Sequence, residues 1–135
     1  MTVQSATQST KSNLLRRTLQ ANAIFSGFSG AAMSVAPGLL AAFLGIDTPL
    51  ILVVIGVSLI LYALALFQVS LQEPLNRTFI ITAIVLDTIW VVASWVILLT
   101  GLVSFTPAGW WVVAIVADIV TVFAVAQFVG LRRIS

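Results

Sequence analysis

Three long apolar stretches constrain most strongly what this chain can fold into. They cover residues 48–71, 78–101 and 107–131. As α-helices rising ~1.5 Å per residue, each is long enough to cross a hydrocarbon core of ~30 Å. Across the whole chain, 61% of residues are apolar and only 7% are charged, whereas soluble domains carry about 25% charged residues. Hydrocarbon must therefore be the solvent for most of the exterior.

The N-terminal third contains a fourth apolar stretch, which is less regular. Residues 1–13 are polar, so we expect a disordered cytoplasmic tail, followed by a span over residues 14–36. Pro37 ends this span, and Pro37–Ile46 is too short to cross alone, so it is predicted as an interfacial helix or a kinked extension of the first helix. A signal peptide cleaved after Ala36 is the alternative, but a proline directly after the cut disfavours it.

These spans predict an all-α integral membrane bundle over residues 14–135. Four transmembrane helices are expected to run up-down-up-down, with a short interfacial segment after the first. The four prolines all fall at predicted helix boundaries, where a missing backbone N–H costs little. The proline positions and the hydropathy pattern therefore predict the same helix boundaries.

The basic residues predict the orientation of the bundle in its membrane. They lie only in the N-terminal segment, the second loop and the C-terminus, which four spans place on one side: Lys11, Arg16, Arg17, Arg77, Arg132 and Arg133. The positive-inside rule then puts both termini in the cytoplasm. Trp110 and Trp111 follow the third loop and fit an aromatic belt at the outer face.

The chain contains no cysteine and no histidine. This absence excludes disulfides, cysteine or histidine metal sites and Ser–His or Cys–His nucleophile pairs. No metal or other cofactor is expected, and an enzymatic role is disfavoured. The small basic excess includes no run interleaved with aromatic residues, so nucleic-acid binding is not predicted either.

Asp87 and Asp118 are the two acidic residues inside predicted spans. Counting residues from the span midpoints places them at nearly the same depth on consecutive antiparallel helices. A carboxylate inside a membrane is costly and usually faces the bundle interior. Two facing carboxylates without a cation cannot both ionise cheaply. The pair is therefore predicted to bind a proton or a cation.

Other polar residues at similar depth are predicted to support this pair. Trp90 shares the helix face of Asp87, and Thr121 shares that of Asp118. Gln127 lies nine residues after Asp118, on the opposite face of its helix, and is a poor candidate by this spacing. The predicted supporting layer consists of Tyr62, Trp90, Thr121, Ser26 and Asn22.

Two further interpretations of the polar layer stay open. The carboxylates could serve only as interhelical hydrogen-bonding groups, or they could anchor the polar end of a bound molecule. Small residues in the first helix form two rows, one of which contains Gly27 and the other Gly30. Such rows favour close helix packing, either within the chain or as a homo-oligomer seam.

The segment Leu14–Ile46, together with Leu86–Trp90, resembles small four-helix membrane proteins of bacteria that have no established activity. The resemblance implies a bacterial inner membrane. Small multidrug-resistance exporters differ, because they carry an essential carboxylate in their first helix. The function expected from the residues is proton or cation binding in transport or sensing, and the alternative is an accessory or assembly subunit of a larger membrane complex.

Overall fold

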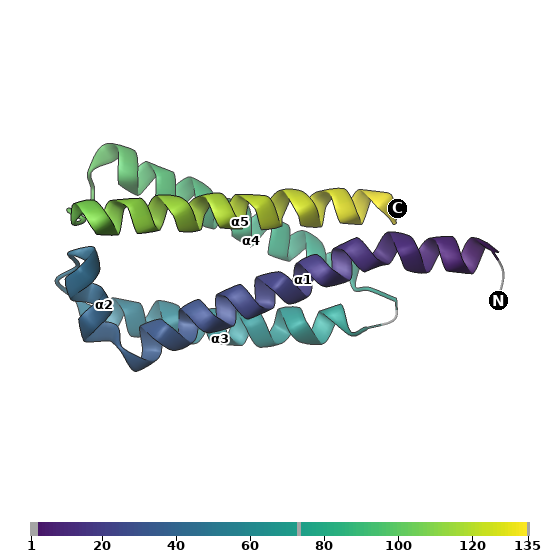
Figure 1. Cartoon of the computed structure of the whole chain (residues 1–135), viewed down its shortest axis with the longest axis horizontal. Coiled ribbons are helices and arrows are strands. Elements are labelled where there is room, and N and C mark those ends of the chain that lie inside the picture. Colours follow the sequence, from purple (N-terminus) through teal and green to yellow (C-terminus); the bar gives the residue numbers. More distant parts are fainter. Residues whose placement is uncertain (1–2, 73, 135) are drawn as a thin grey trace.

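The computed structural model of the chain describes residues 3–72 and 74–134, and side chains from residue 13 onward. This part of the chain is helical, without strands. It forms five helices: α1 (Val3–Val35), α2 (Pro37–Leu44), α3 (Pro49–Ser70), α4 (Arg77–Thr100) and α5 (Pro107–Arg133). The four long helices lie lengthwise beside one another, and α2 lies across one end (Figure 1).

The described helices are those of a membrane protein. α3, α4 and α5 are each long and apolar enough to cross a membrane. A fourth crossing results if the bent pair of Asn13–Val35 and α2 counts as one span. Large aliphatic and aromatic side chains cover the outside of these helices, as expected where lipid replaces water.

The helix boundaries follow the proline and capping signals of the sequence. α3, α4 and α5 begin and end within two residues of the predicted spans. Asn76 caps α4 by accepting a hydrogen bond from Phe79 N, and Thr106 caps α5 by accepting one from Gly109 N. α1 begins at Val3 and thus covers residues predicted as a disordered tail. Residues 3–13 contain neither proline nor glycine, so nothing in them interrupts the helix.

A sharp bend separates α1 from α2. The axes of Asn13–Val35 and Pro37–Leu44 differ by 100°, so Pro37–Leu44 is a separate helix rather than a kinked extension. Gly45 ends α2 with a φ of 84°, a conformation that glycine adopts without strain. Thr106 then ties α2 to the start of α5, because its N–H donates to Leu44 O at 3.0 Å and its hydroxyl donates to Phe43 O at 2.6 Å.

The long helices associate as two pairs. α1 packs along α3, α4 packs along α5, and α1 also contacts α5. The α1–α3 crossing is close: a Cβ added to Gly30 would lie 2.5 Å from Gly56 O. The small residues of α1 are therefore used for packing within the chain. α3 and α4 separate from each other towards the end that carries α2 (Figure 1).

Two clusters of buried apolar side chains lie towards opposite ends of the bundle. One joins α1, α3, α4 and α5 near the chain termini and includes Leu15, Leu19, Leu66 and Ile80. The other lies under α2 and contains Ala41, Leu44 and Leu52, with Phe105 and Val113 packed against it. The apolar core is therefore interrupted in the middle, where the polar residues and a cavity are found.

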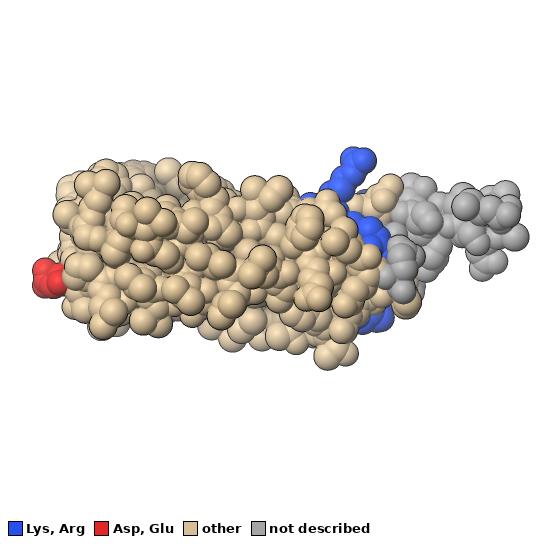
Figure 2. Space-filling model, turned by 90° about the horizontal axis from the view of Figure 1, so that it is seen from below, with Lys and Arg blue, Asp and Glu red and all other residues tan. Residues whose placement is uncertain are grey.

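Charged side chains are confined to the two ends of the face seen in Figure 2. Arginine side chains lie near the chain termini, and an acidic residue lies at the opposite end. Asp47, exposed between α2 and α3, belongs to that opposite end. The uncharged middle of this face matches the part of the bundle that hydrocarbon would surround.

Candidate functional site

Asp87 is the buried acidic residue of the described bundle. It lies on the inner face of α4 and is only 5% exposed. Its Oδ1 accepts a hydrogen bond from the Tyr62 hydroxyl of α3 at 3.0 Å. Its Oδ2 accepts one from Asn22 Nδ2 of α1 at 3.0 Å and one from Gln127 Nε2 of α5 at 3.1 Å. All four long helices therefore meet at one carboxylate.

The two amide side chains are also bonded to each other. Asn22 Nδ2 donates to Gln127 Oε1 at 2.9 Å, and Asn22 Oδ1 accepts from the Ser26 hydroxyl at 3.1 Å. Asn22 and Gln127 are 1% and 0% exposed. We call Asn22, Ser26, Tyr62, Asp87 and Gln127 the Asp87 cluster. Its members satisfy one another's hydrogen-bonding groups, as buried polar groups must.

The side chains that donate to Asp87 are all uncharged. Three neutral donors can replace much of the hydration of a carboxylate, but they leave its charge without a counter-charge. The Asp87 cluster is thus suited to hold either a proton on the carboxyl group or a cationic group beside it. The same bonds also hold the four helices together.

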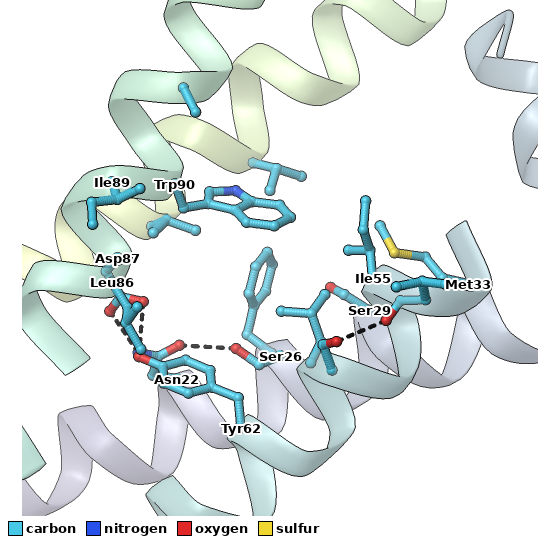
Figure 3. A pocket seen from close by; sticks show the side chains of 17 residues that line it. Asn22, Ser26, Ser29, Met33, Ile55, Tyr62, Leu86, Asp87, Ile89 and Trp90 are labelled. Carbon is cyan, nitrogen blue, oxygen red and sulfur yellow. Dashed lines mark hydrogen bonds between the residues drawn. The ribbon is translucent and has the colours of Figure 1, made fainter. Parts of the chain in front are cut away.

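A cavity of about 520 Å³ adjoins the Asp87 cluster. Figure 3 shows Asn22, Tyr62 and Asp87 on one side of it, with Trp90 and Ser26 nearby. The cavity extends from this polar floor towards α2, between apolar side chains of α1, α3, α4 and α5. Its volume lies within the ~300–1,000 Å³ that is usual for small-molecule sites.

The cavity is only partly enclosed. On the α1 and α5 side its lining includes the buried Ser26 and Val120. On the α3 and α4 side its lining includes Val54, Leu86 and Ile89, which are exposed. The opening therefore lies between α3 and α4, on a flank of the bundle that is covered with large apolar side chains.

Trp90 lines the cavity but does not hydrogen-bond to Asp87. Its Nε1 is buried and has no hydrogen-bond partner in the described part of the chain. The sequence placed Trp90 beside Asp87 as an orienting residue, and the structure places it as an apolar wall of the cavity. Tyr62, Asn22 and Ser26, also predicted as supporting residues, are members of the Asp87 cluster.

Asp118 lies elsewhere. It is exposed on the outer face of α5, and within the part of the chain that the structure describes it makes no hydrogen bond or ion pair. Thr121 is likewise exposed, and its hydroxyl donates to Ala117 O of its own helix. The expected Asp87/Asp118 pair is therefore not formed, because α5 turns the opposite face towards α4.

Gln127 is the cluster residue that the spacing argument rejected. The residue spacing correctly places Gln127 on the face of α5 opposite Asp118. That face, rather than the face of Asp118, is the buried one. Val120, Gln127 and Leu131 recur at helical spacing and are all buried, whereas Ile115, Val122 and Val125 on the Asp118 side are exposed. The available signal was the concentration of small residues such as Ala114, Ala117 and Gly130 on the buried side of α5.

No protein-family model, curated protein or solved structure matches this chain. The function must therefore be argued from the Asp87 cluster and the cavity.

Proposed function

We propose that the chain is a four-span protein of the bacterial inner membrane that binds a small lipophilic cation beside Asp87. The spans would run up-down-up-down with both termini in the cytoplasm, since the described arginines gather at one end and Asp47 lies at the other. Binding would serve transport or sensing rather than a chemical reaction.

The observation that carries the proposal is a mainly apolar cavity with a carboxylate in its floor. Apolar walls select a hydrophobic body, and a carboxylate without a counter-charge selects a positively charged group. Asn22, Tyr62 and Gln127 donate hydrogen bonds to Asp87 but carry no charge. A protonated amine would therefore form the ion pair with Asp87 that these side chains cannot form. A proton is the competing occupant of Asp87.

The route into the cavity favours a molecule from the lipid phase over an inorganic ion. Apolar clusters lie towards both ends of the bundle, whereas the exposed lining residues are on α3 and α4. A lipophilic cation dissolved in the bilayer could enter between these helices without crossing either cluster. Among the described residues, a hydrated ion would have to pass one of the two apolar clusters to reach Asp87 from an end of the bundle.

The test compares 1-adamantylamine, cationic at neutral pH, with the neutral 1-adamantanol. Calorimetric titration of the protein in lipid nanodiscs, corrected with empty nanodiscs, measures both affinities. We expect the amine to bind about tenfold more tightly, or ~1.4 kcal/mol, and to lose that preference in Asp87→Asn. Because protons compete for Asp87, the amine should also bind more weakly at pH 5 than at pH 7.5. Equal affinities in the unmodified protein contradict the proposal.

A cavity-filling variant separates binding from folding. Ala93 lines the cavity but is not part of the Asp87 cluster, so Ala93→Phe should abolish amine binding while the cluster stays intact. Ala108 is exposed outside the cavity, and Ala108→Phe is the matched control. Amine binding that is unaffected by Ala93→Phe would show that the amine does not occupy this cavity.

A second candidate function is purely structural, with the cluster as interhelical hydrogen bonding in an accessory subunit. The observation that favours it is that the amide groups of Asn22 and Gln127 already bond to Asp87 and to each other. In that case Asp87→Asn would lower thermal stability, and neither adamantane derivative would bind with any preference.

A further inference from the structure

Asp118 lies at the centre of an exposed apolar stripe on α5. Trp111, Ile115, Val122 and Val125 follow one another on the same face as Asp118, and each is more than half exposed. Their spacing of four, three, four and three residues is the pattern that forms a seam with another helix. We call these five residues the Asp118 stripe.

Because of its position in the membrane, Asp118 would be costly to expose to lipid. α5 runs from Pro107 to Arg133, so Asp118 is near its midpoint. A carboxylate there is about 15 Å from either edge of a ~30 Å hydrocarbon core. Aspartate is too short to reach the interface as lysine and arginine do. Within the described part of the chain, Asp118 has no hydrogen bond or ion pair to offset its burial in lipid.

We propose that the Asp118 stripe binds a transmembrane helix of another protein that carries a lysine or arginine near the middle of the membrane. The basic side chain would pair with Asp118, and the apolar residues above and below would pack against the partner helix. Pairing removes both charges from lipid, so complementarity of charge at this depth selects the partner.

A second copy of this chain does not supply that complement. Its six basic residues, at positions 11, 16, 17, 77, 132 and 133, all lie outside the central part of the predicted spans. Two copies joined through the stripe would instead bring two Asp118 carboxylates together. The inference is independent of the Asp87 cavity, because Asp118 is not among the residues that line it.

The experiment uses a leucine-rich transmembrane peptide with one central lysine as the probe. The full-length protein carries a donor dye on Ser104→Cys, which is unique because the chain has no cysteine, and the peptide carries an acceptor. Energy transfer in liposomes measures association. We expect the central-lysine peptide to bind about tenfold more tightly than an all-leucine peptide or one with its lysine near an end.

Two protein variants locate the contact. Asp118→Leu should remove the preference for the central-lysine peptide without loss of thermal stability, because Asp118 makes no hydrogen bond or ion pair among the described residues. Ala93→Phe, which fills the cavity and leaves the Asp87 cluster intact, should keep the preference, and this separates the Asp118 site from the cavity. The proposal is overturned if Asp118→Leu binds the central-lysine peptide as well as the unmodified protein does. It is also overturned if the protein shows no preference among peptides, or if it associates with itself through Asp118.

Discussion

Asp87 holds its place through hydrogen bonds from three different helices rather than through an ion pair. Each donor is a neutral side chain, and Gln127 and Asn22 are fully enclosed. In a membrane such bonds replace the water that the carboxylate lost on insertion. The bonding pattern therefore fixes where Asp87 lies without supplying a counter-charge.

Asn22, like Asp87, bonds to three other members of the cluster, since its amide contacts Asp87, Gln127 and Ser26. Asn22→Ala should lower the free energy of unfolding by about 1–3 kcal/mol, because it removes the partners of the buried Gln127 Oε1 acceptor and of the Ser26 hydroxyl donor. Thermal unfolding in detergent, followed by circular dichroism, measures the change. Thr121→Ala is the control, with an exposed hydroxyl bonded within its own helix, and should stay within about 0.5 kcal/mol. Equal losses in both variants would contradict the importance given to Asn22.

The sequence predicted which residues belong to the cluster better than it predicted which residues contact each other. A carboxylate in a span indicated Asp87, and polar residues at similar depth indicated Asn22, Ser26 and Tyr62. The pairing with Asp118 failed because depth says nothing about which helix face points inward. Side chains also point towards the N-terminus of their own helix. Asp87 and Gln127, on helices that run in opposite directions, therefore reach each other from different levels.

The α1–α3 crossing depends on the absence of two side chains. A Cβ on Gly56 would lie 2.7 Å from both Gly30 O and Ser34 Oγ, which is too close without movement of the helices. Gly56→Ala should therefore destabilise the protein by about 1–3 kcal/mol, measured by thermal unfolding in detergent. A wider crossing would also shift the cavity wall that α3 provides.

Gly38 of α2 is the matched control for this prediction. No atom lies within 4 Å of a Cβ added to it, and it is helical without positive φ. Gly38→Ala should be neutral or stabilising by up to about 1 kcal/mol, because alanine favours helix. If Gly56→Ala is as stable as Gly38→Ala, the close contact between α1 and α3 is not what holds this pair together.

The helix boundaries were the most predictable part of the fold, because proline and capping residues act on the backbone next to them in the sequence. Pro49 and Pro107 are the first residues of α3 and α5, and the predicted spans match α3, α4 and α5 to within two residues at each end. Pro37 predicted an interruption before α2, but not that the helix axes would differ there by 100°. The far end of α2 is held by hydrogen bonds from Thr106 to Phe43 and Leu44, which are more than 60 residues away in the chain.

Across the described bundle, many large apolar side chains are exposed, and the polar cluster lies inside. This distribution follows from a hydrocarbon solvent, in which apolar burial gives no preference for the interior and close packing and hydrogen bonds bring helices together. The two apolar clusters lie towards the ends of the bundle, with the cavity between them.

The orientation in the membrane is testable because the chain has no cysteine of its own. Single cysteines can replace Asn13, Asp47, Gln72 or Ser104, each of which is exposed. With four spans and both termini inside, a membrane-impermeant maleimide should label Asp47→Cys and Ser104→Cys in spheroplasts. Asn13→Cys and Gln72→Cys should react only after permeabilisation, because arginine-rich ends stay in the cytoplasm. If Asn13→Cys is labelled together with Asp47→Cys, α1 and α2 form a re-entrant segment and the chain has three spans. The reverse labelling of all four positions would place the arginines outside and refute the orientation.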